Sequence, residues 1–308
     1  MEKFEINTLG CGAALPTPRR LSSSQVINIR EKLFMLDCAE GTQMALRRSH
    51  ITFSRLQAIF ITHLHGDHVF GLIGMLSTFG LLGRTQDLNI YGPQNLKRIF
   101  QPQIDYFCTD SPYRIILHEI DAKNPQIIYE DRSVIISTLP LSHRIPCCGY
   151  LFREKPTPRH IRRDMIDFYH IPISQINNIK AGQDWTTEDG TLIPNERLTT
   201  PSDPIRSYAY CTDTTPCPQL AEHIHGITCL YHEATFAQEH ELLAKKTYHS
   251  TATQAAQIAH DAQVERLILG HFSSRYPSEE QLLKEALQVF PNTILAEDGM
   301  KIVLTPFS

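Results

Sequence analysis

The chain has 308 residues, a formal net charge of −4 and a sequence pI near 6.4, with 42% hydrophobic and 20% charged residues. This composition is ordinary for a globular protein with a large core, and the overall charge does not indicate a nucleic-acid partner, so contact with a polyanion would depend on local basic patches. No stretch reaches membrane-spanning length, no apolar targeting segment opens the chain, and the eight cysteines form no CxxC or disulfide pattern, so we expect a cytoplasmic protein with no membrane partner.

Short apolar runs bounded by Gly, Pro, Asp or Asn predict β-strands along most of the chain. We expect strands at residues 4–9, 25–29, 33–37, 58–62, 88–91, 115–120, 134–139, 208–212, 228–231 and 267–270. A helix is predicted after Ser250-Thr251, with Ala255, Ile258, Ala259 and Ala262 on one side. A second is predicted from Ser278, where Ser278 and Gln281 have capping-box spacing and Leu283, Leu287 and Phe290 form an apolar stripe. Strands with interspersed helices predict an α/β layered domain built around sheet.

Residues 153–204 depart from this pattern, because they are polar, contain several prolines and the only tryptophan, and have few strand-like runs. We interpret them as an arm inserted into a single domain of residues 1–308, with a loose surface loop as the alternative. The start of the arm is rich in cations, which would attract phosphates while the net charge stays negative. These cations are Arg153, Lys155, Arg159, Arg162 and Arg163, with one acid among them.

The strongest functional signal is the run Thr62-His63-Leu64-His65-Gly66-Asp67-His68, at the end of a predicted strand. Imidazoles and carboxylates are ligands that zinc prefers. In an extended segment His63 and His65 point the same way, and Gly66 permits a turn that brings Asp67 and His68 toward a second ion. A solvated histidine-rich loop is the alternative, but this combination at fixed positions is rare by chance.

Three further candidates, His143, Asp213 and His271, each lie just past a predicted strand. A lone residue of this kind is more often a cap or a turn residue, but sites in open α/β folds gather at strand ends. We therefore predict a site for two ions. The assignment is His63, His65 and His143 for one ion, Asp67, His68 and His271 for the other, and Asp213 as the bridge. Two ions would lower the pKa of a shared water for attack on phosphorus, with zinc or manganese as the working ion.

The run at residues 63–68 resembles the HxHxDH signature of the metallo-β-lactamase superfamily, and the chain as a whole resembles ribonuclease Z. Residues 36–43 are similar to the family's DCGEGTQ segment, with Ala39 in place of a glycine. The opening loop (8–12 and 16–20), HEAT (232–235), HST (249–251) and GHFSSRY (270–276) are similar to further family motifs. The resemblance implies an αββα sandwich with an inserted flexible arm and two Zn²⁺ per subunit. The implied activity is an endoribonuclease that removes the 3′ trailer from precursor tRNA by hydroxide attack on a backbone phosphate, working as a homodimer.

The departing ribose oxygen needs a proton, and His249 is the candidate general acid because histidine titrates near the operating pH. The resemblance gives His249 the same role and makes Asp67 the proton acceptor as well as a ligand. We expect Glu233 to orient His249 by a hydrogen bond. Arg19 and Arg20, on the early loop, are expected to meet the acceptor end of the tRNA, while the family's arm grips the tRNA elbow.

The sequence leaves two alternative functions. A small-molecule phosphodiesterase or thioester hydrolase on the same scaffold would explain the ligands and the net charge, but not the basic arm or the HEAT and HST motifs. A non-catalytic RNA-binding scaffold with a decayed site is disfavoured, because all seven candidate ligands are present.

Overall fold

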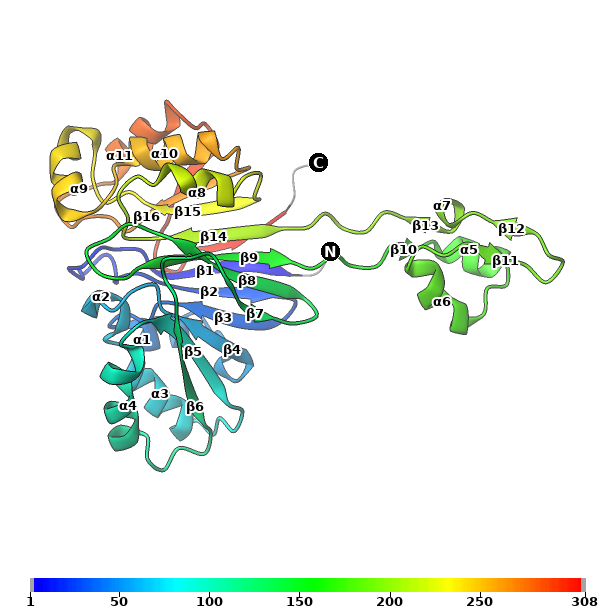
Figure 1. Ribbon diagram of the computed structural model, residues 1–308, viewed down its shortest axis with the longest axis horizontal. Coiled ribbons are helices and arrows are strands. Elements are labelled where there is room, and N and C mark those ends of the chain that lie inside the picture. Colours follow the sequence, from blue (N-terminus) through cyan, green and yellow to red (C-terminus); the bar gives the residue numbers. More distant parts are fainter. Residues whose placement is uncertain (1–2, 306–308) are drawn as a thin grey trace. The chain divides into compact units, whose positions relative to one another are not determined.

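The computed structural model describes residues 3–305, and its chain divides into two compact units. The larger unit comprises residues up to 153 together with those from 206 onward. It contains two seven-stranded sheets (Figure 1). In spatial order, the first sheet consists of β18 (Lys301–Val303), β1 (Phe4–Gly10), β2 (Ser24–Ile29), β3 (Lys32–Leu36), β4 (Leu56–Phe60), β5 (Leu88–Pro93) and β6 (Ile115–Ile120). The second consists of β17 (Thr293–Leu295), β16 (Leu267–Gly270), β15 (Cys229–Glu233), β14 (Ser207–Cys211), β9 (Cys148–Glu154), β8 (Val134–Pro140) and β7 (Ile127–Glu130).

Alternating side chains along the strands of the first sheet bury its two faces in different cores. On β3, Phe34 and Leu36 face the second sheet, where Phe152 lies 5.9 Å from Phe34 between ring centroids. Leu33 and Met35 face the other way, into a core shared with the helices. Both faces are buried, so these strands carry near-continuous apolar runs, as parallel central strands do.

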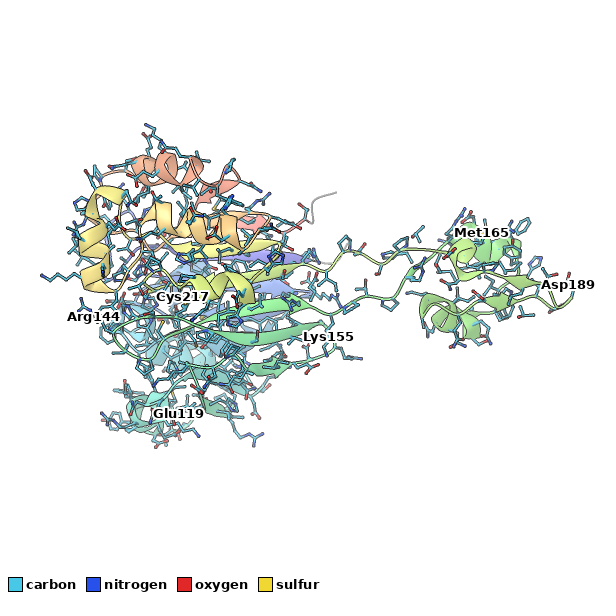
Figure 2. The ribbon with its side chains drawn as sticks, turned by 45° about the horizontal axis from the view of Figure 1, so that its top comes forward. Glu119, Arg144, Lys155, Met165, Asp189 and Cys217 are labelled. Atoms are coloured by element: carbon cyan, nitrogen blue, oxygen red, sulfur yellow. The ribbon has the colours of Figure 1, made fainter. Side chains whose placement is uncertain are left out.

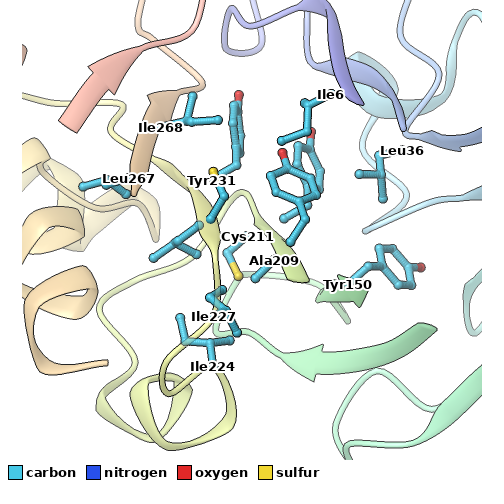
Figure 3. Packing of buried hydrophobic residues seen from close by; sticks show 14 of the residues in the cluster. Ile6, Leu36, Tyr150, Ala209, Cys211, Ile224, Ile227, Tyr231, Leu267 and Ile268 are labelled. Atoms are coloured by element: carbon cyan, nitrogen blue, oxygen red, sulfur yellow. The ribbon is translucent and has the colours of Figure 1, made fainter. Parts of the chain in front are cut away.

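Helices cover the outer face of each sheet, as expected for an αββα sandwich. The first sheet packs against α1 (Thr42–Arg48), α3 (Leu72–Leu81) and α4 (Leu96–Phe107), while the short α2 (Gly66–Val69) follows β4. The second sheet packs against α8 (Pro218–His223), α10 (Ala252–Asp261) and α11 (Glu280–Leu287), with α9 (Glu241–Thr247) and 3₁₀ turns at Phe53–Arg55 and Gln238–His240 completing the unit. Figure 3 shows Ile6 and Leu36 beside Tyr150, Ala209 and Tyr231 in the core between the sheets.

The parallel strands place their carboxyl ends at one edge of each sheet. β3 to β6 run parallel in the first sheet, and β14 to β17 run parallel in the second. Candidate site residues follow the ends of β4, β8, β14 and β16, so the topology delivers them to the same side of the sandwich.

All ten predicted strands are present, and the predicted αββα arrangement is confirmed. The helix after Thr251 is also confirmed, with a capping box between Thr251 and Gln254. The predicted capping box at Ser278 is wrong. α11 begins at Glu280, and Ser278 Oγ accepts from the amide of Glu280 rather than from that of Gln281. The residues buried on this helix are Leu282 and Ala286 rather than the predicted stripe.

Residues 154–205 form the second compact unit, which we call the arm. Its elements are β10 (His160–Ile161), α5 (Arg163–Phe168), α6 (Ile173–Lys180), β11 (Trp185–Thr186), β12 (Leu192–Ile193), α7 (Asn195–Leu198) and β13 (Thr199–Thr200). A small core of Ile171, Ile179, Ile193 and Leu198 holds them together. The arm is therefore a folded unit rather than a loose loop.

Among residues 3–305, no helix has both the length and the apolar character that crossing a bilayer requires.

Candidate metal centre and active site

Three imidazoles from two segments form the first donor group. His63 and His65 follow β4, and His143 follows β8. His63 Nε2 lies 3.0 Å from His65 Nδ1, and His143 Nε2 lies 3.3 Å from the same atom. With one oxygen of Asp213, these atoms all lie within 4.8 Å of one another.

Asp67, His68 and His271 form the second donor group, again within 4.8 Å. Asp213 lies between the two groups and turns a different oxygen toward each. Its Oδ1 lies 3.2 Å from His68 Nε2 and 3.1 Å from His271 Nε2. Its Oδ2 faces His63 Nε2 at 3.7 Å and His143 Nε2 at 3.9 Å. The structure thus brings together all seven predicted ligands in the predicted grouping.

The charge pattern of this cluster is that of a buried anion among histidines. Burial raises the pKa of Asp213, but the neighbouring imidazoles of His271, His68 and His63 outweigh it and hold the pKa well below the usual range. Burial also lowers the pKa of His63 and of His271, which favours the neutral imidazoles that a metal ion requires. His68 differs, because burial lowers its pKa but the carboxylates of Asp213 and Asp37 outweigh it and raise the pKa.

The donor atoms fit divalent cations because the other ring nitrogens are already used. His143 Nδ1 donates to the carbonyl of Tyr248 at 3.0 Å, and His271 Nδ1 donates to Thr235 Oγ1 at 2.9 Å. The Nε2 atoms of His68 and His271 are buried and have no hydrogen-bond partner among the described residues. A divalent cation between these converging ring nitrogens would satisfy them, with the opposite nitrogen of each ring already held by the protein.

Asp37 was not among the predicted site residues, yet it orients the second donor group. It follows β3 and is fully buried. Its Oδ2 accepts from His68 Nδ1 at 2.8 Å, and its Oδ1 accepts from the amide of Thr62 at 2.8 Å, just before His63. Asp37, Asp213 and His271 all have positive φ, between 49° and 57°. Such strained backbone in non-glycine residues is typical of sites whose geometry the fold enforces.

Asp37→Asn is expected to weaken metal binding about 10- to 100-fold, the usual cost of losing a carboxylate behind a histidine ligand. The amide retains an oxygen for Thr62 but loses the charge that fixes the tautomer and ring orientation of His68. Competition with a calibrated chelator measures the affinity. Asp87→Asn, which alters a carboxylate in an exposed pair with Arg114, is the matched control. Unchanged affinity in Asp37→Asn would show that His68 is oriented without it.

His249 lies beside the cluster and is held by Glu233. Its Nδ1 donates to Glu233 Oε1 at 2.9 Å. Burial lowers the pKa of His249, but the charge and hydrogen bond of Glu233 outweigh it and raise the pKa to about 9. Glu233 is itself buried and accepts from the amides of Thr214 and Ser250 and from Thr235 Oγ1. It therefore fixes the loops that carry Asp213 and His249, and through Thr235 it also reaches His271.

The cluster forms the floor of an open cleft of about 500 Å³. The cleft is lined by Ala13, Ala14, Leu15, His65, Gly66, Asp67, His143, Arg144, Asp213, Thr235, Phe236, Thr247, His249, His271, Ser273 and Ser274. Catalytic candidates therefore share one accessible cavity with residues of the β1–β2 loop and of the segment after β16.

Arg19 and Arg20 have protein partners outside the cleft. Arg20 makes a bidentate ion pair with Glu279, and its remaining donor group contacts Cys11 Sγ and the carbonyl of Ala296. Its side chain is 15% exposed. Arg19 donates to the carbonyls of Tyr276 and Pro277. Both arginines tie the early loop to the segment after His271.

Arg20→Ala is expected to lower the free energy of unfolding by about 3 kcal/mol, because it leaves the buried carboxylate of Glu279 without its partner. Denaturant titration measures the loss. If Arg20 contacts the RNA instead, Arg20→Ala should have unchanged stability and a shallower salt dependence of cleavage. That result would show that Arg20 binds the substrate.

The predicted basic residues of the arm occupy varied surroundings. Arg162 pairs with Asp164, Arg159 Nε donates to Thr199 Oγ1, and Arg163 is exposed at the start of α5. Arg153 is exposed on β9, and Lys155 is half-buried. Residues 154–205 carry six Lys or Arg against eight Asp or Glu, so the cations at the start of the arm are a local patch within an acidic unit. Figure 2 labels Lys155, which directly follows β9.

Comparison with known proteins first defines the class. Residues 197–272 match a family model described as "Beta-lactamase superfamily domain", and residues 4–104 match one described as "Anti-Pycsar protein Apyc1". The metallo-beta-lactamase fold protein YhfI from Bacillus subtilis has a TM-score of 0.69 at 18% identity, covering 98% of this chain and 100% of its own, and shows the shared fold. With its two sheets, outer helices and cluster of histidines and aspartates, this protein has the metallo-β-lactamase fold and a candidate divalent-metal centre.

The curated relatives then define the family. Ribonuclease Z of Bacteroides thetaiotaomicron is 56% identical over 308 residues, which is 100% of this chain and 98% of the relative. Ribonuclease Z of Porphyromonas gingivalis strain W83 is 49% identical over 99% of this chain and 100% of its own length. The solved structure of human tRNase Z, short form, has a TM-score of 0.71 at 26% identity, covering 98% of this chain and 100% of that chain. The chain belongs to the ribonuclease Z family.

Proposed function

We propose that this protein is the endoribonuclease that removes the 3′ trailer from precursor tRNA, with two zinc ions per subunit. Membership of the ribonuclease Z family makes it a phosphodiester hydrolase acting on RNA. The observation that carries the two-ion proposal is the position of Asp213, whose two oxygens face two separate donor groups. Nitrogen and carboxylate donors in fourfold sets suit zinc, and manganese is the alternative working ion.

The bound ions would supply an activated water and offset the negative charge that develops on the phosphate. His63, His65 and His143 would hold one ion, Asp67, His68 and His271 the other, and Asp213 both. The remaining steps are proton transfers. Asp67, which lines the cleft with a lowered pKa, stays ionised and takes the proton of the attacking water. Burial raises the pKa of Asp67, but hydrogen bonding and charge from His68 outweigh it.

His249 gives its proton to the ribose oxygen that leaves. The hydrogen bond from its Nδ1 to Glu233 orients the ring and leaves Nε2 available to the cleft. Glu233 favours the charged imidazolium and so keeps a proton ready on a residue that burial alone would leave neutral. Glu233 is thus a positioning residue, while His249 and Asp67 act on the reacting atoms.

We further propose that Arg153, Lys155, Arg162 and Arg163 contact the tRNA outside the cleft, since cations at the start of the arm suit phosphates. Arg153 and Arg163 are the strongest of these candidates because both are exposed, whereas Lys155 is half-buried and Arg162 pairs with Asp164. Arg159, which already donates to Thr199, and the loop residues Arg19 and Arg20 are weaker candidates, because protein groups occupy their donors. A homodimer in the cytoplasm completes the proposal, and gel filtration with light scattering tests the dimer.

The experiment that tests the function is cleavage of a precursor tRNA carrying a 3′ trailer, with and without a zinc chelator and with the product ends mapped. A single chelator-sensitive cut at the 3′ end of the acceptor stem supports the proposal. If the metal-loaded protein leaves the RNA intact yet hydrolyses bis(p-nitrophenyl) phosphate, the small-molecule phosphodiesterase is the correct function instead.

A further inference from the structure

Arg144 brings a permanent positive charge to the lining of the cleft. Among the described residues that line the cleft it is the only lysine or arginine, and residues 13–15, Ser273 and Ser274, which also line it, are uncharged. Arg144 directly follows His143 in the chain, so the metal centre fixes the backbone from which its side chain extends. Arg144, labelled in Figure 2, lies near Tyr248, the residue at the C-terminal end of α9.

The guanidinium group of Arg144 is available for a ligand. Its side chain is exposed, and no carboxylate within residues 3–305 forms an ion pair with it. By contrast, Arg20 pairs with Glu279, and Arg275 lies over the ring of Phe236 at 4.9 Å and donates to Ser273. The cleft therefore contains a positive charge that forms no ion pair with the described residues and takes no part in the proposed proton transfers.

Tyr248 limits where this charge can lie. The central carbon of the Arg144 guanidinium is 6.0 Å from the centroid of the Tyr248 ring, at the outer limit of a cation–π contact. The same ring stands edge-on to His143 at 6.5 Å, and the Tyr248 carbonyl accepts from His143 Nδ1. Tyr248 thus links the metal ligand to Arg144, and it favours a guanidinium over its ring rather than one over the donor atoms.

We propose that Arg144 binds a backbone phosphate of the RNA adjacent to the one that is cut. This inference rests on the proposed function and names the substrate group that the cleft wall recognises. The scissile phosphate belongs over the donor groups, where bound divalent ions would repel a further cation, whereas a polynucleotide presents another phosphate beyond it. A planar guanidinium makes paired hydrogen bonds to phosphate oxygens, and lysine replaces only its charge.

The test compares Arg144→Ala, Arg144→Lys and wild type on precursor tRNA. We expect Arg144→Ala to lower kcat/KM about tenfold, mainly through KM, with Arg144→Lys intermediate. The plot of log kcat/KM against log salt concentration should become shallower by about 0.7 to 0.9 in Arg144→Ala. Arg132→Ala, in the exposed turn before β8 and so at the opposite end of that strand, is the matched control and should match wild type.

Precursors with a single neutral methylphosphonate linkage on either side of the cut locate the contact. At one of these positions, the methylphosphonate should lower kcat/KM of wild type about as much as Arg144→Ala lowers kcat/KM on the unmodified precursor. The same linkage should not lower kcat/KM of Arg144→Ala any further, because the linkage and the side chain are the two partners of one contact. Additive losses at both positions, or an unchanged salt dependence, would overturn the proposal. Bound metal and melting temperature are measured for each variant, and Arg144→Lys decides if Arg144→Ala fails to fold. Absence of cleavage by wild type would instead reject the proposed function.

Discussion

Asp213→Asn is expected to lose most of its bound metal and to cleave precursor tRNA on the order of 10³-fold more slowly, or worse. The substitution keeps the size of the side chain but leaves one oxygen in place of two and removes the only negative charge that both donor groups share. Metal ions contribute several kcal/mol to such reactions, and about 1.4 kcal/mol corresponds to each tenfold change in rate. Elemental analysis of the purified protein and single-turnover cleavage measure the two losses.

A second variant distinguishes the loss of the bridging ligand from the loss of a ligand that serves only one ion. His65→Ala removes a donor from the first group but leaves Asp67, His68, His271 and Asp213 in place, so it should retain about half of the metal. Asp87→Asn, in an exposed ion pair, is the control for loss of a carboxylate. If Asp213→Asn kept as much metal as wild type, Asp213 would not be the bridge, and the two-ion assignment would have to be replaced.

Much of this site could be predicted from the sequence, because its residues follow strands that are easy to recognise. β4, β14 and β16 are short apolar runs, and His63, Asp213 and His271 come within three residues of their ends. In a parallel sheet, strand ends of this kind meet at one edge. Local pattern and topology therefore agree, which is why the sequence alone predicts the grouping of the seven candidate ligands.

Asp37 could not be assigned in this way, although its sequence motif was recognised. Its carboxylate acts across strands, reaching Thr62 after β4 and His68 in α2. That contact depends on the register between β3 and β4, which the sequence alone does not specify. A carboxylate at the end of a buried strand, next to one that ends in a metal motif, is the signal that could have identified it.

Arg20 shows the opposite difficulty. A basic residue on a loop near an RNA-cleaving site suggests a substrate contact, but Glu279 lies more than 250 residues away and meets Arg20 only in the folded protein.

The strand β9 was not predicted from the sequence for a similar reason. Its sequence Cys-Gly-Tyr-Leu-Phe-Arg-Glu is almost wholly buried between neighbours on both sides, so it lacks the alternation of an exposed strand. Tertiary contacts, not local pattern, decide both cases.

His249→Ala is expected to lower kcat on precursor tRNA by about 10²- to 10⁴-fold while the protein keeps its metal. The substitution removes the proton donor and none of the seven candidate ligands. A leaving group that needs no proton provides the internal comparison. Because p-nitrophenolate departs as an anion near neutral pH, hydrolysis of bis(p-nitrophenyl) phosphate should fall far less than RNA cleavage does. Equal losses on both substrates would show that His249 supports the structure of the centre and is not the general acid.

Glu233→Gln provides the pH signature of the same step. A general acid works only while protonated, so the rate falls as pH rises through its pKa. Glu233 raises the pKa of His249, hence its replacement by a neutral amide should move the basic limb of the kcat profile to lower pH. Bound divalent ions add positive charge and shift the limb in the same direction in both proteins, so the comparison is made at equal metal occupancy. A lower rate with an unmoved basic limb would mean that Glu233 holds the loops of Thr214 and Ser250 without tuning the acid.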